Sequence, residues 1–314
     1  MIYACHKCQK EFETLQTDLT GGRCPACGSK FPGMFAGKTV RDFQIIGELA
    51  RGATGVVYVA QQPLLRRDVA LKLIINELSS DQERIEQFFG EARAVARIQH
   101  PNIVQALTAG VDTNGVCYFA MELVEGETLE NKLDNFGALE FADAMHIGAR
   151  ISEALAFAWR RTKLVHGDIK PANILLSKKD GEPKLADLGQ AHFGDDETVI
   201  DSLMATPLYV PPELIRGEYD KIGAKTDIYS FGAMLYELFV GEPPFYSLDM
   251  DEVLQMQLSD KPQPLKSRLG FFDETLSDYI DSMLAKNPDL RPDNWYEVAE
   301  FMRKIELRTK IKSN

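Results

Sequence analysis

The sequence predicts an α+β protein with a small β-rich lobe, a large helical lobe and a short metal-binding module before them. Four of the five cysteines fall within the first 27 residues. From about Phe43 to Val124, β-branched runs with the period of strands dominate, with one helical insert. From about Leu129 onward, apolar residues recur at helical spacing. The predicted boundaries are 1–38 for the module and its linker, 39–124 for the β-rich lobe, 125–309 for the helical lobe and 310–314 for a tail.

Composition and charge exclude several classes of protein. Hydrophobic residues make up 45% of the chain and charged residues 26%, which is typical of a globular protein rather than a disordered one. The net charge of −12 argues against a general nucleic-acid binder, which would normally be basic. The sequence contains no apolar run of about 18 residues and no secretory signal pattern. We therefore expect a cytoplasmic protein, whose thiols stay reduced, with no membrane or nucleic-acid partner.

The N-terminal cysteines have the spacing of a zinc ribbon. Cys5 and Cys8 form one C-x2-C pair, Cys24 and Cys27 form another, and fifteen residues separate the pairs. Two such knuckles can aim four thiolates at one tetrahedral ion. A unit of 38 residues has too little core to fold alone, and structural Zn²⁺ would supply the missing stability. The alternatives are two structural disulfides or a redox-active C-x-x-C pair.

A glycine-containing turn lies between two apolar runs at the start of the β-rich lobe. Gly52 and Gly55 would let backbone N–H groups approach phosphate oxygens closely, although an ordinary hairpin turn would look similar. Downstream, the period of a strand puts Ala70 and Lys72 on one face of an apolar segment. Glu91 lies on the apolar stripe of the following helical segment. These two charged residues stand at otherwise apolar positions, which favours one buried ion pair between them. A purely structural salt bridge is the alternative.

A second group of polar residues lies in the helical lobe. His166, Asp168, Lys170 and Asn173 stand between apolar runs, and Asp187 follows Asn173 by fourteen residues. Two aspartates and an asparagine on adjacent loops could supply oxygen ligands for Mg²⁺ and a base for a hydroxyl group.

Together these motifs resemble the protein kinase signature. The chain carries, in order, a glycine loop, V-A-L-K, a helix glutamate, H-G-D-I-K-P-A-N, D-L-G, P-P-E and D-I-Y-S-F-G. The resemblance covers about Phe43 to Ile305 and is to the Hanks-type (eukaryotic-like) serine/threonine kinases of bacteria. It implies a bilobal protein kinase fold with ATP and Mg²⁺ (or Mn²⁺) as cofactors.

The resemblance also implies residue roles. Lys72, paired with Glu91, would hold the α- and β-phosphates, and Asn173 and Asp187 would bind the metal ions. Asp168 would orient the substrate hydroxyl and accept its proton, and Lys170 would neutralise charge at the γ-phosphoryl group. The other implied ATP-contacting positions are Ala50, Gly52, Gly55, Val57, Ala70, Met121, Glu122, Val124 and Leu175. Two structural roles are implied as well: Asp227 would anchor the catalytic loop, and Arg291 would pair with Glu213.

Lys170 and Thr206 resemble the residues of serine/threonine kinases rather than tyrosine kinases. The implied activity is transfer of the ATP γ-phosphoryl group to serine and threonine hydroxyls of proteins, including the chain itself, with Thr206 in the catalytic set. The alternative is a pseudokinase scaffold that binds nucleotide without turnover. For the zinc ribbon we favour a protein partner or packing against the kinase over nucleic acid, since few aromatic residues are available to stack bases.

The most informative departure from the kinase pattern is Gly167. Many kinases have an arginine there, which captures a phosphate on the activation segment. Without that guanidinium group, phosphorylation of Thr198 or Ser202 loses its main local partner. We therefore predict that activity does not require phosphorylation of either residue.

Overall fold

A computed structural model describes residues 2–4, 11–13, 37–52, 55–74, 82–187, 192–193, 207–270 and 272–312. The chain divides into two compact units. The first comprises Met1–Ala96 and Gln105–Leu123, and the second comprises Arg97–Val104 and Val124–Asn314. A β-rich unit and a mainly helical unit agree with the predicted α+β class. The second unit also includes Arg97–Val104, a segment that the sequence reasoning placed in the β-rich lobe.

Among the described residues of the first unit, six strands form an antiparallel sheet in the order β3-β4-β5-β6-β8-β7. The strands are β3 (Thr39–Val40), β4 (Phe43–Gly52), β5 (Gly55–Gln62), β6 (Arg67–Leu73), β7 (Ala106–Val111) and β8 (Cys117–Glu122). Helix α1 (Gln82–Ala96) packs against β7 and β8. A separate two-stranded ribbon joins β1 (Ile2–Ala4) and β2 (Glu11–Glu13).

Alternation along the central strands builds the core of the first unit. On β6, Val69, Leu71 and Leu73 pack into one buried cluster, so that Ala70 and Lys72 lie on the opposite face. Both of these residues are also buried. The free thiol of Cys117 is buried in β8, as the sequence indicated.

Packing inside the sheet requires a glycine at position 55. Its φ of +151° is rarely adopted by residues with a side chain, and a Cβ atom there would lie 2.4 Å from the backbone oxygen of Leu73. The glycine therefore lets the β4–β5 hairpin approach β6 closely, which is a reason for this residue that the sequence reasoning did not give.

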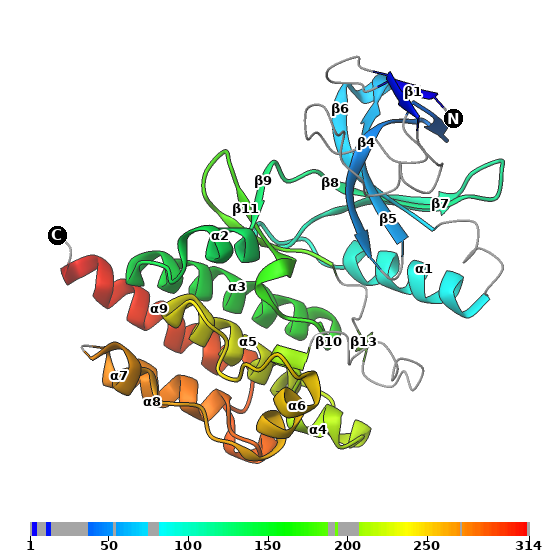
Figure 1. The fold of residues 1–314 in the computed structure, drawn as a ribbon. Helices are drawn as coiled ribbons and strands as arrows, with labels where there is room; N and C mark the ends of the chain where they lie inside the picture. Colours follow the sequence, from blue (N-terminus) through cyan, green and yellow to red (C-terminus); the bar gives the residue numbers. More distant parts are fainter. Residues whose placement is uncertain are drawn as a thin grey trace. The chain divides into compact units, whose positions relative to one another are not determined.

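The second unit is built around α5 (Ala224–Val240), a helix that is apolar on nearly every side and buried along most of its length. Its remaining helices are α2 (Leu129–Phe136), α3 (Phe141–Thr162), α4 (Pro212–Ile215), α6 (Met250–Ser259), α7 (Leu265–Leu269), α8 (Glu274–Met283) and α9 (Trp295–Lys312). Helix α3 runs along α9 and contacts α5, which in turn contacts α7 and α8 (Figure 1).

Close helix packing depends on small residues. A Cβ atom on Gly148 of α3 would lie 2.6 Å from Met302 and 2.8 Å from Leu235.

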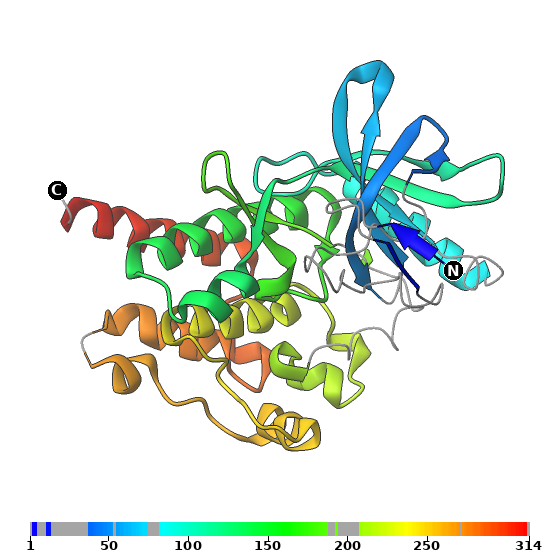
Figure 2. The same ribbon diagram turned by 45° about the horizontal axis from the view of Figure 1, so that its top comes forward.

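Figure 2 shows the same helices from a second direction. Within the described part of the chain, no helix combines the length and the apolar character needed to cross a bilayer.

Short strands in the second unit carry the polar loops. β11 (Ile174–Ser177) pairs with both β9 (Gly126–Thr128) and β12 (Pro183–Leu185), and β10 (Leu164–Val165) pairs with β13 (His192–Phe193). The segment Arg97–Val104 supports β12 from the side: Leu185 N donates to Asn102 O at 2.8 Å, and Val104 N donates to Leu185 O at 2.9 Å. The loops before β11 and after β12 are thereby fixed to one small sheet.

Candidate active site

In the first unit, strand register aligns several of the predicted ATP-contacting residues. Ala50 on β4 lies opposite Val57 on β5, and Val57 lies opposite Lys72 on β6. Ala70 lies opposite Met121 on β8, one residue before Glu122 at the end of that strand. The predicted residues therefore form neighbouring rows across the sheet. The side chain of Lys72 is buried, with 5% exposed.

Helix α1 carries Glu91, whose side chain lies outside the described part of the structure. The helix packs through Phe88 and Ala92, which are both buried. The Phe88 ring meets Phe119 edge-on at a centroid distance of 6.5 Å, and Phe119 lies opposite Lys72 in the strand register. The helix thus contacts the sheet at the level of Lys72, while the Lys72–Glu91 pair itself stays a prediction.

In the second unit, Asp168, Lys170 and Asn173 form one cluster. The Lys170 Nζ atom lies 2.7 Å from Asp168 Oδ2. The Asn173 Nδ2 atom donates to the same oxygen at 2.9 Å and to the Asp168 carbonyl at 2.7 Å. Both N–H groups of the Asn173 amide donate to Asp168, so the amide oxygen, Asn173 Oδ1, points in another direction. These bonds hold the two ends of the loop from Asp168 to Asn173 together.

A buried carboxylate holds the backbone before Asp168. Asp227 Oδ2 accepts from the N–H of His166 at 2.7 Å, and Oδ1 accepts from the N–H of Gly167 at 2.9 Å. Burial raises the pKa of Asp227 to about 7, while the two N–H bonds act in the opposite direction. Gly167 has a φ of +77°, where glycine is favoured. The implied anchoring role of Asp227 is thus confirmed by these bonds.

His166 links the catalytic loop to the segment that carries Asp187. Its Nδ1 accepts from the N–H of Asp168 at 3.3 Å, and its Nε2 lies 3.3 Å from the Ala186 carbonyl oxygen. Burial lowers the pKa of His166, which favours the neutral ring that this pattern of one acceptor and one donor requires. The sequence reasoning quoted this histidine within its motif but gave it no role.

Asp187 follows directly and has a φ of +55°, a strained conformation for a residue with a side chain. The Ala186 N–H donates to the Asn173 carbonyl at 2.8 Å, so the two implied metal ligands lie on joined segments. Carboxylate and amide oxygens are ligands that Mg²⁺ prefers, and the donor set therefore fits that ion.

Several other predicted site residues lie either in the second unit or outside the described residues. Leu175 lies half-buried on β11 and Val124 lies just before β9, both in the second unit. Thr206 and the four cysteines Cys5, Cys8, Cys24 and Cys27 lie outside the described residues. Within the described ranges, no cluster of three or more histidine, cysteine or acidic side chains is arranged to hold a metal ion.

The implied pair of Glu213 and Arg291 is confirmed. Arg291 Nη1 and Nη2 donate to the two carboxylate oxygens of Glu213, each at 2.7 Å, and both side chains are fully buried. Arg291 also donates to the carbonyls of Ala285 and Lys225 at 2.8 Å. The bidentate pair joins the start of α4 to the segment before α9.

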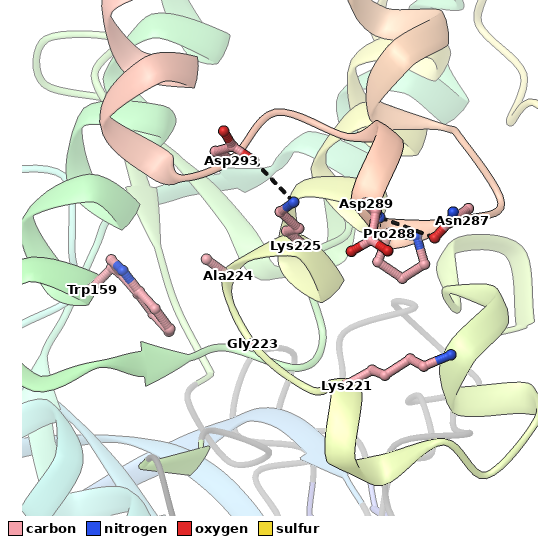
Figure 3. A pocket seen from close by; sticks show the side chains of 9 residues that line it. All are labelled: Trp159, Lys221, Gly223, Ala224, Lys225, Asn287, Pro288, Asp289 and Asp293. Carbon is pink, nitrogen blue, oxygen red and sulfur yellow. Dashed lines mark hydrogen bonds and ion pairs between the residues drawn. The ribbon is translucent and has the colours of Figure 1, made fainter.

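A separate pocket of about 360 Å³ lies at the start of α5 (Figure 3). Trp159, Lys221 and Lys225 contribute to its wall, and Lys225 forms an ion pair with Asp293 at 3.1 Å. The predicted catalytic residues do not line it.

Known proteins with similar sequences are protein kinases, in agreement with the geometry of the Asp168 cluster. The protein kinase domain family matches residues 43–302. A probable serine/threonine-protein kinase of Clostridium perfringens is 32% identical over 87% of this chain and 39% of its own length. The serine/threonine-protein kinase PkaA of Streptomyces coelicolor is 36% identical over 78% of this chain and 46% of its own length. The serine/threonine-protein kinase PknB of Mycolicibacterium smegmatis is 34% identical over 84% and 42%, respectively.

The chain thus spans less than half the length of each of these relatives. The family match nevertheless covers most of its residues, including the whole series of motifs from the glycine loop to Arg291. The chain belongs to the protein kinase family.

Proposed function

We propose that this chain transfers the γ-phosphoryl group of ATP to serine and threonine hydroxyls of protein substrates, including its own. The observation that carries the proposal is the cluster in which Asp168 Oδ2 lies 2.7 Å from Lys170 Nζ and 2.9 Å from Asn173 Nδ2. The Asp227 carboxylate holds the backbone that leads into this cluster. The names of the relatives support serine and threonine as acceptors, and we include Thr206 in the catalytic set on the sequence pattern alone.

The proposed reaction uses Asp168 as the proton acceptor. As the substrate hydroxyl oxygen forms its bond to the γ-phosphorus, its proton passes to an Asp168 carboxylate oxygen, and the bond to the bridging β–γ oxygen breaks to release ADP. Lys170 lies beside the same carboxylate and would offset negative charge on the transferred group. His166 and Asp227 act on the backbone, so they are positioning residues rather than catalytic ones.

Asn173 and Asp187 would hold Mg²⁺ (or Mn²⁺), since both supply oxygen donors on joined segments. When bound, the ion would supply positive charge against the phosphate oxygens. In the first unit, Lys72 paired with Glu91 would hold the α- and β-phosphates. The glycine loop and adenine contacts are proposed at Ala50, Gly52, Gly55, Val57, Ala70, Met121, Glu122, Val124 and Leu175.

Radiolabelled transfer to a generic protein acceptor tests the proposal. Asp168→Asn should abolish transfer and leave Mg·ATP binding intact, because the change removes a base and not a nucleotide contact. Asp180→Asn is the control, since Asp180 is an exposed carboxylate on the turn between β11 and β12. Equal transfer by wild type and Asp168→Asn would contradict the proposal. Nucleotide binding without any transfer by the wild type would favour the pseudokinase alternative.

We also propose structural Zn²⁺ at Cys5, Cys8, Cys24 and Cys27, in a zinc ribbon that serves a protein partner or packs against the kinase. The support is the cysteine spacing, together with the reduced thiols that the expected cytoplasmic location would imply. Elemental analysis of the purified protein should find one equivalent of zinc, and replacing Cys5 and Cys24 by serine should remove it. Disulfides in place of zinc, detected by mass spectrometry without reduction, would contradict this assignment.

A further inference from the structure

A pocket of about 490 Å³ lies in the second unit, between the segment that follows α6 and the segment that follows α8. Pro262, Pro264, Leu284 and Leu290 give it an apolar wall. Leu284 is buried, whereas Leu290 is 70% exposed, so the wall runs from the interior of the unit to its surface. A pocket of this volume can hold a small ligand or one large side chain of another protein.

Asp281, on α8, brings a carboxylate without a partner to this pocket. Its side chain lines the pocket, and its Oδ1 atom is buried and accepts no hydrogen bond from the residues that the structure describes. Burial raises the pKa of Asp281, the Asp278 carboxylate acts in the same direction, and Lys266 opposes them. Because Lys266 pairs with Asp278 and Glu274, at 3.3 Å and 3.0 Å, it is not free to bind Asp281. A cation in the pocket would stabilise the ionised form of Asp281.

Two lysines line the same pocket, and in the described part of the chain neither forms an ion pair with Asp281. The Lys286 Nζ atom donates to the Tyr229 hydroxyl oxygen at 3.0 Å and lies over the Phe245 ring at 4.1 Å. Burial lowers the pKa of Lys286 to about 7, so this residue is only partly charged at neutral pH. Lys261 is exposed, and water and salt screen its charge. The positive group of a ligand would therefore have Asp281 as its counter-ion.

The lining also selects the kind of cation. An apolar wall favours a methylene stem, and the Asp281 carboxylate favours a positive group at the end of that stem. Asp260, an exposed residue of the lining, adds a second negative charge. A guanidinium group is more weakly hydrated than an ammonium group, so it loses less hydration free energy when it enters an apolar pocket. These properties are those of an arginine side chain.

The open side of the pocket favours a polypeptide over a free small molecule. Since Leu290 is largely exposed, part of the apolar wall would stay in contact with water around a free guanidine. The backbone and neighbouring side chains of a bound polypeptide would cover this part, and removal of apolar surface from water stabilises a complex.

We propose that this pocket binds an arginine side chain of a partner protein, with the guanidinium group at Asp281 and the methylene stem against Leu284 and Leu290. The predicted catalytic residues do not line the pocket. The inference therefore does not depend on the proposed kinase activity, and its test needs no phosphoryl transfer.

Titration of the full chain with N-acetyl-arginine amide, followed by NMR of leucine methyl groups, tests the proposal. The signals of Leu284 and Leu290 should shift and reach saturation. N-acetyl-citrulline amide has nearly the same shape without the charge and should bind at least about fivefold more weakly. Equal binding of the two compounds would overturn the proposal. Binding of butylguanidine without binding of the arginine amide would overturn the assignment to a polypeptide.

Variants with matched controls locate the site. Asp281→Asn keeps the size of the side chain and should weaken binding of the arginine amide at least about fivefold, because it removes the counter-ion. Asp220→Asn makes the same change of charge at an exposed residue outside the pocket and should have no effect. Unchanged binding in Asp281→Asn would contradict the proposal.

Leu290→Ala keeps the proposal testable if Asp281→Asn does not fold, since Leu290 is exposed and its replacement should not disturb the core. It should weaken binding of the arginine amide about twofold to fivefold, because the stem loses part of its wall. Leu307→Ala is the control, as Leu307 is an exposed leucine of α9 outside the pocket. Equal binding by these two variants would overturn the placement of the arginine stem.

Discussion

The two units position their functional residues by different means. In the β-rich unit, the backbone pairing of β5 with β6 sets the positions of Val57 and Lys72. Because side chains alternate between the two faces of a strand, no side-chain hydrogen bond is needed to place them. In the helical unit, Asp168 stands on a loop held by polar side chains from distant parts of the chain, such as Asp227, 61 residues after His166. Register makes the first arrangement robust, whereas the second depends on a few buried polar atoms.

This difference predicts where single substitutions should be most damaging. Loss of a buried polar partner leaves other polar groups without compensation, whereas a side chain added at a glycine of the sheet acts through steric contact and backbone strain.

Arg291→Met should lower the free energy of unfolding by about 3–5 kcal/mol, because it leaves the Glu213 carboxylate buried without its partner. Lys266→Met is the control, since the Lys266–Glu274 pair is exposed to solvent and its loss should leave the free energy of unfolding nearly unchanged. Urea unfolding of both variants measures the difference. Similar losses would show that buried polar contacts do not dominate the helical unit.

Gly55→Ala tests the sheet. Its Cβ atom would meet the Leu73 carbonyl at 2.4 Å with a φ of +151°, and we expect a loss of about 1–3 kcal/mol in stability. Gly47→Ala is the matched control on β4, because a Cβ atom at that position has no neighbour within 4 Å. Thermal unfolding compares the two. A Gly55→Ala variant as stable as Gly47→Ala would remove the packing explanation for this glycine.

The stability of the helical unit should depend on pH through Glu237. Burial raises the pKa of Glu237 from 4.5 to about 7. The hydrogen bond that the Tyr209 hydroxyl donates to this carboxylate acts in the opposite direction. The folded state therefore keeps this proton where the unfolded state has lost it, and stability should fall as the pH rises from about 4.5 to 7. Glu237→Gln cannot titrate at this position and should make the fall shallower, while Asp227, whose pKa burial also raises to about 7, keeps its own contribution. Parallel pH profiles of melting temperature for the two proteins would contradict the assignment.

The smallest effect is expected at the activation segment. Replacing Thr198 and Ser202 by alanine should leave the transfer rate within about twofold of wild type, since Gly167 offers no guanidinium group to a phosphate there. Rates with a peptide acceptor measure this directly. A loss of two orders of magnitude would mean that another group captures the phosphate.

The same difference explains how much the sequence could predict. The opposite faces of β6, the buried Lys72 and the helical character of 129–312 follow from periodicity, which is a local property. The kinase motifs led to Asp168, Lys170 and Asn173, but their bonds depend on loop conformations. The link from His166 to Ala186 could not be derived, because periodicity carries no information on contacts between loops. A histidine two residues before a candidate base, in an apolar setting, was the available signal.

The burial of Gln257 on α6 lies further still from what the sequence could indicate. A glutamine on the polar side of a helical pattern normally faces water, yet here it is completely buried because it satisfies the carbonyls of a turn some fifty residues away. Gly55 is a second case: the sequence predicts a phosphate contact for it, and the structure adds that the neighbouring strand leaves no room for a Cβ atom. Both outcomes arise from tertiary contacts that no local pattern encodes.

The cluster around Asp168 is the proposed centre of phosphoryl transfer. Mass spectrometry of purified protein incubated with Mg·ATP, with nucleotide binding measured by calorimetry on the same samples, tests it directly. We predict that the wild type gains phosphate on its own serine or threonine residues, and that Asp168→Asn binds the nucleotide equally well but gains none. Phosphate incorporation by Asp168→Asn at the wild-type rate would contradict the account.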